Sequence, residues 1–77
     1  MYTLPQTAEF IIKSICPEPD KVELQSQEKD DEILLEVVAP PELTGQIVGR
    51  NGRMIKAVRS ILNLTFPNQK YILEVRS

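Results

Sequence analysis

The chain has 77 residues, of which 42% are hydrophobic and 26% are charged, so one small globular domain is expected rather than a disordered chain. It contains no histidine and one cysteine, which excludes a Cys–His or Ser–His catalytic pair, an internal disulfide and the usual Cys/His zinc site. The net charge of −2 and the pI near 5.0 argue against a protein that binds nucleic acid.

Residues 4–16 are expected to form an amphipathic helix. Its apolar face consists of Leu4, Ala8, Ile11, Ile12 and Ile15, which recur at helical spacing. Pro5 suits the first turn of a helix, and Pro17 and Pro19 end it. Phe10 lies off the apolar face, and the sequence leaves open whether it is a rim residue or a contact for a partner.

Two strands are expected next. Alternating apolar residues predict a half-buried strand at about 21–27, and the polar residues 28–31 predict a turn. The denser apolar run 33–38 favours a central strand, with Ile33, Leu35 and Val37 on one of its faces.

The second half of the chain predicts two helices and a third strand. A short helix at about 41–48 begins with a proline and an acid, and a turn at 49–52 leads to a longer helix at about 52–64. About half the circumference of the longer helix is apolar, comprising Met54, Ala57, Val58, Ile61, Leu62 and Leu64, with Ile55 at the margin. Alternation from Tyr71 onward predicts the last strand.

The predicted fold class is therefore α+β, a single domain over residues 1–77 with the order α-β-β-α-α-β. The first two strands form an antiparallel hairpin. The third strand returns through a right-handed two-helix crossover and lies parallel to the second. The result is a three-stranded mixed sheet in the order 1-2-3, with the helices on one face and the other face open.

Charge is distributed unevenly along the chain. Residues 1–44 carry ten acidic residues and three lysines, whereas residues 45–77 carry six basic residues and one glutamate. The charge pattern alone is explained most simply by solvated faces of opposite sign. The basic second half nevertheless reopens the possibility of nucleic-acid binding.

The strongest candidate site is the turn Gly49-Arg50-Asn51-Gly52 between the two later helices. Glycines let a backbone approach a ligand closely, and a helix N-terminus presents free N–H groups and the positive end of its dipole. Arg53 and Lys56 follow directly. The alternative is a purely structural turn between helices. Four basic residues and no acid between positions 50 and 59 favour an anion site, and specifically a site for phosphate.

Residues 47–59, Ile-Val-Gly-Arg-Asn-Gly-Arg-Met-Ile-Lys-Ala-Val-Arg, resemble the KH-domain signature I-[IV]-G-[KR]-x-G-x-x-I-K-x-[LIV]-R. The predicted element order is similar to the type II, bacterial arrangement of that fold. Length and the residues around the signature resemble the small stand-alone bacterial KH proteins of the KhpA type. The acidic first half weakens any expectation of strong general RNA affinity.

The resemblance implies binding of single-stranded RNA, in post-transcriptional regulation or as an RNA chaperone. Residues 49–52 would hold phosphates, supported by Arg53 and Lys56. The apolar floor under the bases would be Ile47, Val48 and Ile55, with the strand near Val37 as the opposing wall. The sequence leaves open whether Ile47 and Val48 are plain core residues. Because the motif lacks aromatic residues, weak stacking and modest affinity are expected.

A second interpretation is a KH-shaped protein-interaction module with little RNA affinity. The broad apolar side of the longer helix supports it, as does a patch expected at Leu34, Val38 and Ile72. The resemblance implies a homodimer, or a heterodimer with a larger KH-containing RNA-binding protein. We expect a cytoplasmic protein without membrane contact, because no targeting or membrane-spanning segment is recognisable. We expect no catalysis, cofactor or metal, because the sequence offers no histidine, no set of metal ligands and no phosphate-binding P-loop.

Overall fold

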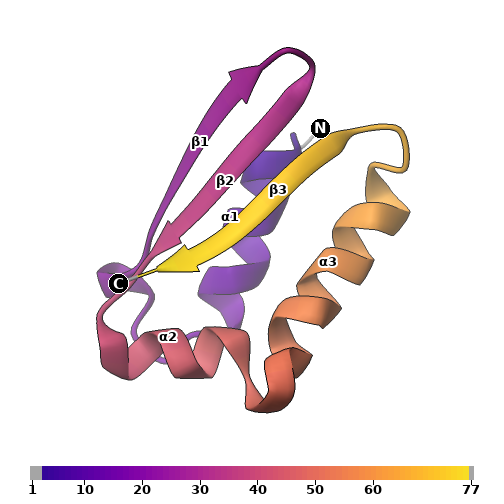
Figure 1. Ribbon diagram of the computed structural model, residues 1–77. Coiled ribbons are helices and arrows are strands. Elements are labelled where there is room, and N and C mark those ends of the chain that lie inside the picture. The colour runs from indigo at the N-terminus through magenta and orange to yellow at the C-terminus, as the bar shows by residue number, and fades with distance from the viewer. Residues whose placement is uncertain (1–2, 77) are drawn as a thin grey trace.

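The computed structural model describes residues 3–76, and Figure 1 shows how its helices and strands are arranged. They are α1 (Leu4–Ile15), β1 (Glu23–Lys29), β2 (Glu32–Val38), α2 (Pro41–Val48), α3 (Arg53–Thr65) and β3 (Lys70–Arg76). Short 3₁₀ turns at Pro19–Lys21 and Arg50–Gly52 complete the chain. The predicted α+β class and the order α-β-β-α-α-β are confirmed.

The hairpin between β1 and β2 is tighter than the sequence indicated. Asp30 and Asp31 alone form the turn, and both adopt positive φ angles, of 51° and 67°. Lys29 therefore pairs with Glu32 and Glu28 with Ile33, so β1 extends two residues beyond its predicted end. Asparagine or glycine is the usual sequence signal for such a two-residue turn, and aspartate is a weaker one.

The sheet has the predicted strand order β1-β2-β3. Strand β2 pairs antiparallel with β1, where Leu24 lies opposite Val37, and parallel with β3, where Leu35 lies opposite Leu73. Helices α1 and α3 lie on one side of this sheet, and α2 crosses the lower end in Figure 1. Thr3 caps α1 through a reciprocal pair of hydrogen bonds with Gln6.

The core lies between the sheet and the helices. Its largest fully buried side chains are Ile12, Leu35, Ile47, Leu62, Val37 and Val58. Cys16 is buried and acts as a small apolar core residue. On the open face of the sheet, half-buried Leu34 pairs with Ile72, which is 43% exposed. Two of the three residues of the predicted patch therefore lie side by side, but the pair Glu36 and Glu74 separates them from half-buried Val38, which lies opposite Arg76.

Helix α3 buries less of its apolar side than its composition suggested. Only Val58 and Leu62 are fully buried, whereas Ala57 is exposed, Ile61 is 43% exposed and Leu64 is 84% exposed. The core of a domain this small ends before it reaches those three side chains. Phe10 is 70% exposed on the outer side of α1.

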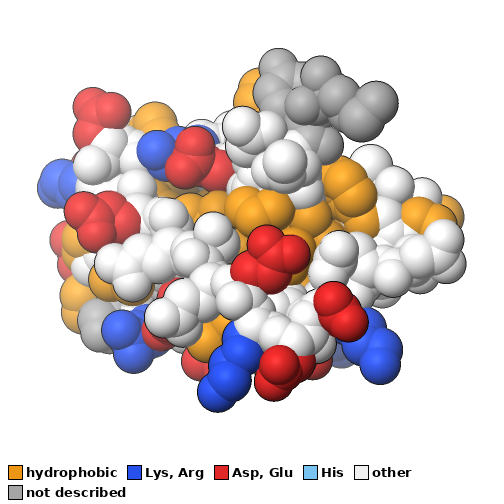
Figure 2. Space-filling model, turned by 90° about the horizontal axis from the view of Figure 1, so that it is seen from above, with side chains coloured by type: hydrophobic (Ala, Val, Ile, Leu, Met, Phe, Trp, Pro, Cys, Tyr) orange, Lys and Arg blue, Asp and Glu red, His pale blue; other side chains and the backbone are white. Residues whose placement is uncertain are grey.

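The two ends of the molecule differ in character. The end with the hairpin carries charged side chains around a band of hydrophobic ones (Figure 2). A shallow hollow of about 380 Å³ opens there between the start of α1, the hairpin and Phe66. The turn between α2 and α3 lies at the opposite end (Figure 1).

Candidate nucleic-acid interface

The turn between α2 and α3 is built by left-handed backbone. Gly49, Asn51 and Gly52 have φ angles of 80°, 58° and 73°. The Gly49 N–H donates to the Gly45 carbonyl at 2.8 Å, and the Gly52 N–H donates to the Gly49 carbonyl at 3.1 Å. The main chain thus holds the turn by itself. The side chains of Arg50 and Asn51 are exposed.

The two glycines have different structural roles. A Cβ on Gly49 would lie 2.7 Å from Cγ and 2.8 Å from the backbone N of Met54, so this glycine permits close packing against the first turn of α3. A Cβ on Gly52 would meet nothing closer than 3.9 Å. These are ordinary contacts with the side chains of Ile55 and Lys56, so at Gly52 the positive φ, rather than crowding, favours glycine.

Positive charge at the turn is not neutralised by neighbouring carboxylates. Arg50, Arg53 and Lys56 are exposed. Within residues 3–76 the ion pairs join Lys21 to Glu18 and Arg76 to Glu36, so none involves these three side chains. The N-cap of α3 is Gly52, which has no side chain to cap the first N–H groups of the helix. The Arg53 N–H instead donates to the Arg50 carbonyl. Cationic side chains and the positive end of the helix dipole coincide at this turn.

The apolar residues assigned to the site by resemblance divide into two groups. Val48 and Ile55 are half-buried beside the turn, so each presents some surface. Ile47 has no exposed surface and lies in the core, which decides that alternative for this residue. Of the strand residues near Val37 that were expected to form an opposing wall, Val37 itself is excluded, because it lies on the helix-facing side of β2 and is completely buried.

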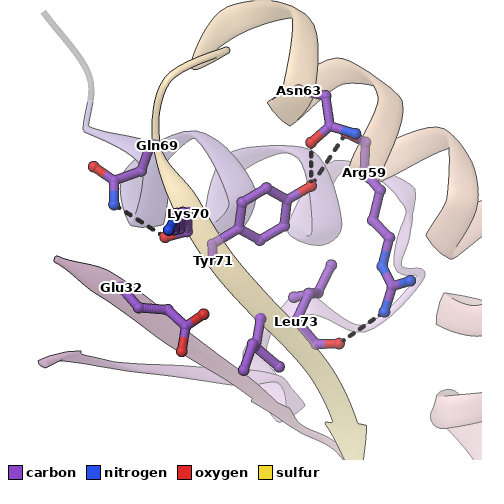
Figure 3. A pocket seen from close by; sticks show the side chains of 8 residues that line it. Glu32, Arg59, Asn63, Gln69, Lys70, Tyr71 and Leu73 are labelled. Carbon is purple, nitrogen blue, oxygen red and sulfur yellow. Dashed lines mark hydrogen bonds between the residues drawn. The ribbon is translucent and has the colours of Figure 1, made fainter. Parts of the chain in front are cut away.

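A polar cluster between α3 and β3 was missed by sequence reasoning. The Nη2 atom of Arg59 donates to the Leu73 carbonyl at 3.2 Å. The Tyr71 hydroxyl donates to Oδ1 of Asn63 at 2.9 Å and approaches the Arg59 carbonyl at 3.3 Å (Figure 3). Burial raises the pKa of the Tyr71 hydroxyl, and the positive charge of Arg59 opposes that shift. The spacing of four residues between Arg59 and Asn63, which puts both on one side of the helix, was the available signal in the sequence.

This cluster lines an open pocket of about 490 Å³ at the edge of β3. Its walls are formed by Glu32, Arg59, Asn63, Gln69, Lys70, Tyr71, Ile72 and Leu73. The Gln69 amide donates to the carbonyls of Asp31 and Lys70, which fixes the start of β3. Two cations and one carboxylate line the pocket, so its charge is net positive.

An α-β-β-α-α-β domain whose last two helices meet at a Gly-x-x-Gly turn is a KH domain of type II. Residues 5–75 match the family described as KhpA/KhpB, KH domain. The chain belongs to this family.

Several relatives bear the name RNA-binding protein KhpA. The one from Clostridium acetobutylicum is 30% identical and aligns over 94% of this chain and 99% of its own. The one from Clostridium perfringens is 28% identical with the same coverage. The one from Borreliella burgdorferi is 37% identical over 70% of this chain and 66% of its own. No solved structure matches the chain. Among residues 3–76, no helix has the length and apolar character needed to cross a membrane.

Proposed function

We propose that this protein binds single-stranded RNA by clamping its backbone at the turn between α2 and α3. The observation that carries the proposal is the coincidence at this turn of a helix N-terminus without a capping side chain and of exposed Arg50, Arg53 and Lys56, none of which belongs to an ion pair among residues 3–76. Phosphate is the ligand for which these groups are suited. The relatives named RNA-binding protein KhpA support RNA as the source of that phosphate.

Each residue of the turn has a distinct part in the proposal. Gly49 and Gly52 shape the backbone, and Arg50 and Asn51 reach the phosphates. Arg53 and Lys56 add attraction from the first turn of α3. Val48 and Ile55 provide apolar surface for bases, and Ile47 supports them from the core.

With Val37 buried, no opposing wall is assigned at the turn. The pocket beside β3 is lined by Glu32, Gln69 and Lys70, next to the hairpin between β1 and β2 and away from the turn. It is therefore not assigned to the RNA-binding groove. We assign modest affinity because no aromatic residue lies in the turn itself. In this proposal the protein binds RNA without catalysing a reaction, and it acts in the cytoplasm in post-transcriptional regulation or as an RNA chaperone.

Self-association is the second part of the proposal. Ala57, Ile61 and Leu64 form an exposed strip on α3, which we call the apolar strip. A second copy of the chain would cover it, and a larger KH-containing RNA-binding protein is the alternative partner. If the strip proves to be the only functional surface, the protein is an interaction module with little RNA affinity.

One titration separates these functions. Isotope-labelled protein is titrated with a short single-stranded RNA of mixed sequence while backbone amide shifts are followed. Shifts centred on residues 47–56 are expected. Unchanged amides there, combined with shifts along the apolar strip when a partner protein is added, would reject RNA binding in favour of the interaction module.

A further inference from the structure

Helix α3 presents three flanks with different chemistry. One flank carries Val58 and Leu62 into the core. A second flank carries Lys56, Arg59 and Asn63, of which the last two contact β3. The third flank is the apolar strip, which lies between Arg53 and half-buried Met54 around the helix at 3.6 residues per turn. RNA binding and self-association consequently use different sides of one helix.

The apolar strip is self-complementary when two copies pack with antiparallel α3 helices. With a two-fold axis near Ile61, the two Ile61 side chains meet, and Ala57 of each copy faces Leu64 of the other. The contact is reciprocal, as in any isologous interface. A small residue then lies opposite a large one, which allows the two helices to pack closely. A parallel pair would instead set alanine against alanine and leave a gap beside the leucine pair.

Electrostatics favour the same arrangement. Arg50, Arg53 and Lys56 lie at the N-terminal end of α3, where the helix dipole adds positive potential. A parallel pair would bring both clusters of cations together at one end. An antiparallel pair places them at opposite ends. Ile61 lies eight residues beyond Arg53, or about 12 Å along the axis, so the two turns are about 24 Å apart in that direction.

The two-fold axis also determines which groups share a face. The two-fold axis of an antiparallel pair is perpendicular to the plane that contains both helices. A side of α3 that points along this axis therefore points in the same direction on both copies. The side of α3 that points away from both cores lies between the second flank and the apolar strip. It carries exposed Arg53, Lys56 and Ser60, which we call the basic track. The basic tracks of the two copies therefore open on the same side of the dimer, and the two-fold rotation makes them run in opposite directions.

We propose that the dimer binds two segments of single-stranded RNA running in opposite directions. The inference rests on the proposed RNA binding at the turn and on self-association through the apolar strip. Each site binds RNA with the same 5′-to-3′ direction relative to its own α3. Because the two-fold axis is perpendicular to the two helices, the segments on the two copies run with opposite polarity. The segments come from one strand that turns back or from two separate strands.

The test uses RNA segments joined with defined polarity. Two identical six-nucleotide RNAs of mixed sequence are connected by a flexible polyethylene glycol linker just able to span about 24 Å. They are joined 3′-to-3′, 5′-to-5′ or in ordinary 5′-to-3′ tandem. One inverted linkage should bind about 10²-fold more tightly than the free hexamer, because the second binding event becomes intramolecular. The 5′-to-3′ tandem should show this gain only with a longer linker, because its second segment must turn back to bind with opposite polarity. Two free hexamers per dimer show that separate strands also fill both sites.

Ile61→Lys is the matched control, since it should abolish the gain while the affinity for one free hexamer remains. Equal gains for all three short linkages, or no gain although the hexamer binds, would overturn the inference and leave the proposed RNA binding intact. A protein that is monomeric at all concentrations would overturn it likewise. A free hexamer that does not bind would instead refute the proposed function and this inference with it.

Discussion

Gly49 lies so close to Met54 that a Cβ atom on this glycine would stand 2.7 Å from Cγ of Met54. The φ of 80° and ψ of 171° at Gly49 also lie in a region that essentially only glycine occupies. Gly49→Ala should therefore lower the free energy of unfolding by more than Gly52→Ala. At Gly52 an alanine should cost only the roughly 1–2 kcal/mol of αL backbone strain, because its Cβ would meet ordinary contacts at 3.9 Å and beyond. Urea denaturation of both variants gives the comparison. Equal losses would show that neither the contact with Met54 nor the backbone conformation of Gly49 adds a cost.

Replacing Arg50 and Asn51 together by Asp should remove most of the RNA affinity and leave the fold intact. Both side chains are exposed, and such substitutions usually change stability by less than about 0.5 kcal/mol. Aspartate also tolerates the φ of 58° at position 51. Two negative charges would then face the phosphate. RNA titration and thermal melting check the two halves of this prediction.

A matched control for this double variant combines Lys29→Asp with Asn68→Asp. Both positions are exposed, and the change in net charge is the same. Because they lie near the other end of the molecule, beyond the ~8–10 Å screening length of physiological salt, RNA affinity should change little. An equal loss in both double variants would mean that overall charge, rather than the turn, determines binding.

The salt dependence of RNA affinity counts the phosphates that the protein neutralises. Arg50, Arg53 and Lys56 predict two to three contacts, so log K against log salt should have a slope of about −1.5 to −2, at about −0.7 per phosphate on single strands. Arg50→Gln should make the slope less steep by about 0.7. A slope near zero would place the basic residues outside the contact surface.

Local patterns in the sequence predicted most of the fold and the position of the turn. The alternation of Ile33, Leu35 and Val37 identified the central strand, and the glycine spacing identified the turn at 49–52, although not the positive φ angle of Asn51. The contacts of Arg59 with Leu73 and of Tyr71 with Asn63 depend on how α3 is aligned with β3, which periodicity does not encode. Periodicity likewise marked Ile61 as apolar without telling whether the core or a partner would cover it.

The Tyr71 hydroxyl should ionise at higher pH than an ordinary tyrosine, because burial raises its pKa. The neutral form is the one favoured by folding, so this contribution to stability is fully present below the ordinary pKa and is lost as pH rises through the raised value. Ultraviolet titration of a Tyr2→Phe variant isolates this group. An ordinary ionisation curve would contradict its burial. Tyr71→Phe should cost about 1 kcal/mol through the lost bond to Asn63.

Ile61→Lys should convert a dimer to a monomer without unfolding the domain. Ile61 is 43% exposed and Leu62 beside it is completely buried, so the same substitution at position 62 should unfold the chain. Sedimentation at high concentration should show a monomer for Ile61→Lys, with a melting temperature close to that of the parent measured under dilute conditions. Ser60→Lys adds the same charge on the neighbouring flank of α3 and should leave association intact. If both variants remain dimeric, the copies meet through another surface, of which exposed Phe10 on α1 is the next candidate.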